Sequence, residues 1–72
     1  MHPAVQRQLR RFDYGHLPPE LAEVSKQFSV VAHYVAENLD GDEVTYCLRD
    51  LLRAKDCAVR AKVEMNDNAG KE

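Results

Sequence analysis

The side chains that could bind a ligand in this sequence are basic and aromatic, and they fall in three segments. Five cations lie between Glu43 and Met65: Arg49, Arg53, Lys55, Arg60 and Lys62. Lys26 lies in an earlier helical segment, and Tyr14 and His16 share a connector that precedes it. An aromatic ring can stack on a flat base, while cations and the free N–H groups of a helix N-terminus hold a phosphate. The pattern predicts a site for a small anionic ligand with flat bases, built from Tyr14, His16, Lys26, Arg53, Lys55 and Arg60.

Each of these residues also has an ordinary structural interpretation. Lys55 repeats the apolar spacing of its segment, so its stem can lie along a helix seam while its ammonium group reaches water or a nearby carboxylate. Arg53 and Arg60 can lie on a solvated or salt-bridged helix face, and Lys26 can be a plain surface residue. Tyr14 can pack over the helices as readily as it can stack on a ligand. The sequence leaves both interpretations open.

Residue patterns typical of catalysis or metal binding are absent from the sequence. His2, His16 and His33 are scattered, and Cys47 and Cys57 form no C-x-x-C pair. Spacing allows a pair between Cys57 and His16, but nothing supplies an orienting third group or a glycine-rich oxyanion loop. We therefore expect no enzyme activity, no catalytic residue, no metal and no cofactor. His33 is expected to be a partly buried or exposed helix residue.

The sequence pattern predicts an all-α fold. We expect a short helix at residues 3–11, a rigid connector at 13–19, helices at 19–39 and 43–65, a turn at 40–42 and a flexible tail at 66–72. So short a turn makes the two long helices antiparallel neighbours, so that residues 1–65 form one helical hairpin domain. Gly15 permits unusual backbone angles in the connector, and Gly41 is expected to stop the second helix. Apolar spacing predicts the buried face of that helix: Leu21, Val24, Phe28, Val31, Val35 and Leu39.

Self-association is the expected source of additional stability. Seventy-two residues are too few for a large core. Cys47 and Cys57 are separated by about 15 Å of helix rise, which is too far for a disulfide within the chain. Segment 43–65 has apolar side chains on more than one side, so one short partner helix cannot cover it. We expect a homo-oligomer.

Composition and charge narrow the classes of binding partner and the cellular compartment. A formal net charge of −2 argues against a general nucleic-acid binder, which is usually basic overall. No N-terminal apolar run resembles a signal peptide, and no apolar segment is long enough to cross a bilayer. We therefore expect a reducing cytosol with both thiols free, and no membrane partner.

Two blocks of sequence resemble small proteins of actinobacterial bacteriophages. These blocks are FDYGHLPPELAEVSKQF and LRDLLRAKDCAVRA, and the resemblance covers roughly residues 2–63. The shared features are the aromatic-x-Tyr-x-His-Leu-Pro spacing, the Val-Ser-x-x-Phe of the second helix and the Ala-Lys-Asp-x-Ala-Val-Arg-Ala run. The phage proteins look like members of the helical-hairpin superfamily of anti-defence sponges, which includes anti-CBASS and anti-Thoeris proteins.

The resemblance implies binding without chemistry. Such sponges are homo-oligomers, often hexamers, that hold cyclic di- or trinucleotides between subunits in the cytoplasm of the infected host and do not cleave them. In the anti-CBASS branch an N-terminal tyrosine and a lysine on the next long helix contact the ligand, and Tyr14 and Lys26 match them. Lys55 matches a lysine found in part of the superfamily. Arg60 departs from the pattern, because other branches carry a small residue there.

Two other classes of function remain as alternatives. A helical assembly or protein-inhibitor module would use segment 43–65 only as an adhesive surface. A small DNA-binding regulator would use the cationic first helix, with Arg7, Arg10 and Arg11, but it conflicts with the acidic net charge. Duplex nucleic acid is therefore not an expected partner, and a steep salt dependence of duplex binding would be the sign of that class.

Overall fold

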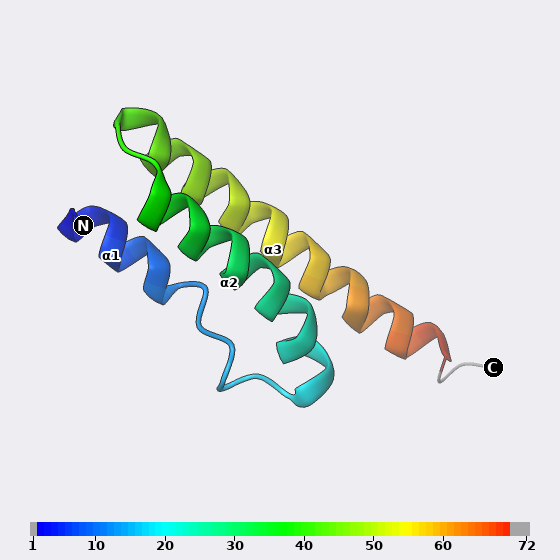
Figure 1. Ribbon diagram of the computed structural model, residues 1–72. Helices are drawn as coiled ribbons and strands as arrows, with labels where there is room; N and C mark the ends of the chain where they lie inside the picture. Colours follow the sequence, from blue (N-terminus) through cyan, green and yellow to red (C-terminus); the bar gives the residue numbers. More distant parts are fainter. Residues whose placement is uncertain (1, 70–72) are drawn as a thin grey trace.

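The computed structural model describes residues 2–69 and has three α-helices (Figure 1). These are α1 (Pro3–Arg10), α2 (Pro19–Asn38) and α3 (Asp42–Ala69). Helices α2 and α3 form an antiparallel hairpin, and α1 lies along it with the N-terminus near the α2–α3 turn. The predicted all-α class and the helix-plus-hairpin arrangement are confirmed. None of the three helices is both long and apolar enough to span a membrane within the described part of the chain.

The helix ends follow local chemistry. At the start of α1, the His2 side chain accepts a hydrogen bond from the backbone N–H of Ala4 at 3.1 Å, which satisfies a donor that the helix itself leaves free. Helix α2 begins with Pro19, whose fixed φ suits a first helical position. Gly41 follows α2 with φ +111°, a backbone angle that favours glycine.

Helix α3 continues four residues beyond the predicted end at Met65. Its last turn is tied to the start of α2, because the Asn66 side-chain amide donates to a Glu20 carboxylate oxygen at 2.8 Å. The predicted tail therefore begins inside the helix, and residues 70–72 lie outside the described residues. The hydrogen bond that joins this turn to α2 links residues 46 positions apart, so it could not be read from local propensity.

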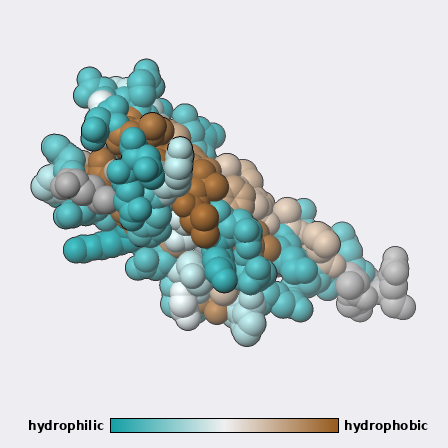
Figure 2. Space-filling view, viewed as in Figure 1, coloured by the Kyte–Doolittle hydropathy of each residue, from teal (hydrophilic) through white to brown (hydrophobic). Residues whose placement is uncertain are grey.

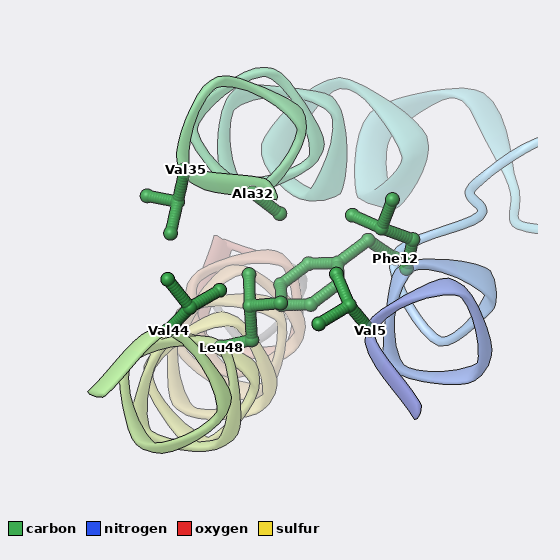
Figure 3. Close-up of a cluster of buried hydrophobic side chains, with 7 residues drawn as sticks. Val5, Phe12, Ala32, Val35, Val44 and Leu48 are labelled. Carbon is green, nitrogen blue, oxygen red and sulfur yellow. The ribbon is translucent and has the colours of Figure 1, made fainter. Parts of the chain in front are cut away.

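The core lies where the three helices meet (Figure 3). Its buried apolar members are Val5, Leu9, Phe12, Ala32, Val35, Val44 and Leu48. Phe12, just after α1, extends its ring towards Leu48 of α3, and both side chains are almost fully buried. An isolated helix of eight residues is marginal in water, so this docking holds α1 in place.

The predicted buried face of α2 is partly wrong. The helix buries Ser25, Ser29, Ala32 and Val35, whereas Val31 is 48% exposed and Leu39 is also exposed. Small side chains at Ser25, Ser29 and Ala32 let another helix approach closely, and this packing outweighs the preference for burying the larger valine. The apolar stripe read from the sequence lies to one side of the true contact.

One face of the hairpin carries apolar side chains that this chain does not cover. Helix α1 occupies one side of the α2–α3 pair in Figure 3, and no element of residues 2–69 occupies the other. Helical spacing places Val24 and Val31 of α2 and Ala54 and Ala58 of α3 on this face. Phe28 and Leu51 border it and are partly buried against the core. Figure 2 shows hydrophobic surface around the α2–α3 turn and paler hydrophobic atoms along α3. Such a face fits the prediction that further copies pack here.

Candidate functional site

An open groove lies between the α1–α2 connector and the C-terminal half of α2. Its volume is about 980 Å³. The connector contributes Asp13, Tyr14, Gly15 and His16, and α2 contributes Ser29, Val30, His33, Tyr34, Glu37 and Asn38. It therefore combines two tyrosine rings and two imidazoles with two carboxylates, a lining suited to a flat, polar molecule.

The connector holds Tyr14 and His16 against α2. Phe12 anchors one end of it in the core, and the backbone N–H of Asp13 donates to the Arg10 carbonyl at 3.2 Å. Beyond the tyrosine, the N–H of Leu17 donates to the Tyr14 carbonyl at 3.1 Å, which closes a turn around His16. Tyr14 is half-buried and His16 is exposed. The predicted pairing of these two side chains in one site is thus present in the fold.

Gly15 does not use the positive φ that glycine permits. Among the described glycines, only Gly41 has a positive φ. A Cβ atom added at Gly15 would meet nothing within 4 Å. The bends of this connector are instead set by the anchoring of Phe12, the turn around His16 and the Pro18-Pro19 pair at the start of α2.

The α2 wall of the groove follows the helix repeat. Val30, His33, Tyr34 and Glu37 are spaced at i, i+3, i+4 and i+7, which places them along one side of the helix. Tyr34 is 60% exposed, and its backbone carbonyl accepts a hydrogen bond from the Asn38 amide at 2.8 Å. His33 Nδ1 lies 3.9 Å from a Glu37 carboxylate oxygen, an ion pair only when the imidazole is protonated.

Lys26 lies just beyond the rim of the groove. Its side chain is exposed, and it precedes Ser29 and Val30 by three and four positions on α2. Residues at these spacings are neighbours on a helix surface, so a flexible lysine stem can extend its ammonium group towards the groove. Of the four cations in the predicted site, Lys26 is the one whose helical spacing places it next to the groove lining.

Lys55 contacts the C-terminal end of α1 instead of the groove. Its Nζ donates to the Arg11 carbonyl at the end of α1 at 2.9 Å and lies 3.5 Å from an Asp56 carboxylate oxygen. The same ammonium group is 5.9 Å from the centre of the Phe12 ring. The side chain is only 13% exposed, so its stem lies along the seam between α1 and α3. This arrangement matches the structural interpretation of Lys55 and keeps it out of the groove.

Arg53 and Arg60 lie on the outer side of α3. Arg53 follows the buried Val44 by nine positions, which is half a turn around the helix, and its side chain is exposed. Arg60 is exposed and donates to the Cys57 sulfur at 3.4 Å. The sequence prediction that these cations share a flank with Tyr14 is wrong within one chain, because helical phase points them away from α2.

Sequence reasoning missed the groove's α2 wall. We expected His33 to be an ordinary helix residue and did not consider Tyr34 or Glu37 as site residues. Their common helical phase was visible in the sequence, but the connector's position beside that phase was not. Among the described residues, no group of three or more His, Cys, Asp or Glu side chains is placed to hold a metal ion.

Comparisons with known proteins add no family assignment. No protein-family model, no curated protein and no solved structure matches this chain. The resemblance to phage anti-defence sponges therefore rests on the sequence blocks quoted above.

Proposed function

We propose that this protein is a phage anti-CBASS sponge that binds cyclic di- or trinucleotides made by the host and sequesters them without cleavage. The observation that carries the proposal is the groove between the connector and α2, with Tyr14 and Tyr34 on its walls and Lys26 one turn beyond its rim. Stacking on tyrosine is tolerant of base identity and gives a base a defined place. The lysine supplies a positive charge for the neighbouring phosphate.

The uncovered apolar face supports the oligomeric part of the proposal. In a homo-oligomer, expected to be a hexamer, symmetry-related copies would bring two grooves to face one ligand. A cyclic dinucleotide has two bases and two phosphates related by approximate twofold symmetry, so two equivalent grooves could each take one base. Arg53 and Arg60, which lie far from the groove of their own chain, would then be available to a neighbour's ligand. The setting of this function is the cytoplasm of the infected host.

A thermal-shift panel tests the proposal directly. The purified protein is heated with cyclic dinucleotides, cyclic trinucleotides and cyclic ADP-ribose isomers, and any ligand that stabilises it is recovered by denaturation and checked by chromatography. A sponge shows a raised melting temperature and returns its ligand intact. Recovery of an altered ligand would show an enzyme instead, and no shift with any ligand would contradict nucleotide binding.

Matched variants connect binding to the groove. Tyr14→Ala is expected to weaken binding at least about tenfold, since stacking on an aromatic ring contributes roughly 1–3 kcal/mol per base. Tyr46→Ala is the control, because Tyr46 is a half-exposed ring on α3 outside the groove lining. Lys26→Ala is expected to weaken binding and to reduce its salt dependence, with Lys62→Ala as its control. Equal losses in test and control variants would contradict the assignment of the site.

The uncovered apolar face also favours a second candidate, an assembly or protein-inhibitor module. Such a module would use Val31, Ala54 and their neighbours as its contact surface and would not need the groove. It predicts that Tyr14→Ala and Lys26→Ala retain full activity against the host defence. The sponge proposal predicts that both variants lose that activity.

A further inference from the structure

The polar rim of the groove has an acidic character that the sequence prediction did not anticipate. Among the described residues that line it there is no lysine or arginine, whereas Asp13 and Glu37 both contribute carboxylates. Glu37 lies on α2 beside Tyr34, and Asp13 lies on the connector beside Tyr14. A ring held between these walls would therefore meet hydrogen-bond acceptors at its edge.

The two carboxylates have acceptor capacity to spare. Neither side chain accepts a hydrogen bond from another described residue. His33 Nδ1 is 3.9 Å from a Glu37 carboxylate oxygen, which is too long for a hydrogen bond. The Glu37 side chain is 62% exposed and can change rotamer without breaking core packing. A carboxylate accepts two parallel hydrogen bonds best from a pair of adjacent N–H donors.

We propose that the Asp13 and Glu37 carboxylates make this groove selective for guanine. The Watson–Crick edge of guanine presents two adjacent donors, N1–H and the N2 amino group, which match a carboxylate. Adenine and cytosine each present one donor group beside an unprotonated ring nitrogen, and uracil presents one N–H between two carbonyl oxygens. In each of these three bases a lone pair faces the carboxylate, which is repulsive. The inference rests on the proposed function, and it narrows the ligands to guanine-containing cyclic nucleotides.

Isothermal titration calorimetry with three cyclic dinucleotides tests the inference. The ligands are the diguanosine, diadenosine and diinosine compounds, the last of which keeps N1–H but lacks the N2 amino group. We expect the diguanosine compound to bind at least about tenfold more tightly than the diadenosine compound, as charge-assisted hydrogen bonds to one base edge permit. The diinosine compound is expected to have an intermediate affinity.

Charge-neutral variants assign the preference to the two carboxylates. In Glu37→Gln and Asp13→Asn, one acceptor oxygen becomes a donor NH₂ group, which no longer matches the adjacent N1–H and N2 donors of guanine and does match the donor and acceptor of adenine. The double variant is expected to reduce the guanine preference to less than about threefold. Glu23→Gln is the control, because it makes the same change on α2 at an exposed position outside the groove. Circular dichroism of each variant confirms that the helices are intact.

The outcomes separate this inference from the proposed function. Equal affinity for the guanine and adenine compounds would overturn guanine selectivity while leaving the sponge proposal standing. A preference that survives in the double variant would also overturn it, because the carboxylates would not be its source. Failure of all three cyclic dinucleotides to bind would overturn the inference, and the trinucleotide and cyclic ADP-ribose titrations would then decide whether the broader proposal also fails.

Discussion

Replacing Lys55 with methionine should destabilise the protein without directly touching the groove. The substitution keeps an unbranched stem along the seam between α1 and α3 but removes the ammonium group. The hydrogen bond of 2.9 Å from Nζ to the Arg11 carbonyl is then lost, together with the favourable charge at the C-terminal end of α1. The contact with the Phe12 ring is also lost.

The size of the effect follows from these contacts. Hydrogen bonds to charged groups contribute roughly 1.5–3 kcal/mol, and the lower part of that range applies because Arg11 is an exposed residue whose carbonyl can regain water. We expect a loss of about 1.5–2 kcal/mol, which for a chain of this length corresponds to a decrease in melting temperature of roughly 6–16 °C. Hydrogen exchange should show the greatest loss of protection in α1.

Urea denaturation followed by circular dichroism, at one fixed protein concentration, measures the free energy of unfolding. Lys62→Met is the matched control, since Lys62 lies on the same side of α3 and makes no hydrogen bond or ion pair with another described residue. It should change stability by no more than about 0.5 kcal/mol. If Lys55→Met leaves stability unchanged but weakens nucleotide binding, Lys55 acts on the ligand and our assignment of it to α1 docking is refuted.

Three further predictions test other parts of the structure, two of them with a comparison variant. Gly41→Ala should cost about 1–2 kcal/mol because of its φ of +111°, whereas Gly15→Ala, with open space and no positive φ, should be neutral in the same urea titration. Ser25→Ala should raise stability by about 1 kcal/mol in thermal unfolding, because its fully buried hydroxyl has no hydrogen-bond partner among residues 2–69. A loss of stability would show that the hydroxyl is satisfied. Val31→Glu, on the uncovered face, should lower the mass of the assembly measured by sedimentation velocity. Gln6→Glu on α1 is the control and should leave that mass unchanged. An unchanged mass in both variants would place the contact between copies elsewhere.

The architecture could be predicted because its signals are local. Prolines at helix starts, the Asp40-Gly41-Asp42 turn and continuous helix-forming segments determine where each helix lies to within a few residues. The buried stripe of α2 could not be read in the same way. Apolar spacing favours Val31, but the packed structure buries Ser25 and Ser29 instead, because close contact between helices depends on the shapes of both partners.

In the candidate site, too, some features follow from the sequence and others depend on tertiary structure. The sequence alone identified Tyr14 and His16 as neighbours in a connector and Lys26 as a cation on the helix that follows. Tertiary structure decided that the connector lies back along α2, beside Tyr34 and Glu37, and that Lys55 is directed to the end of α1. The physical reason is that residue type and helical phase are local properties, whereas the direction of a connector is set by the distant contacts that anchor it, here Phe12 against Leu48.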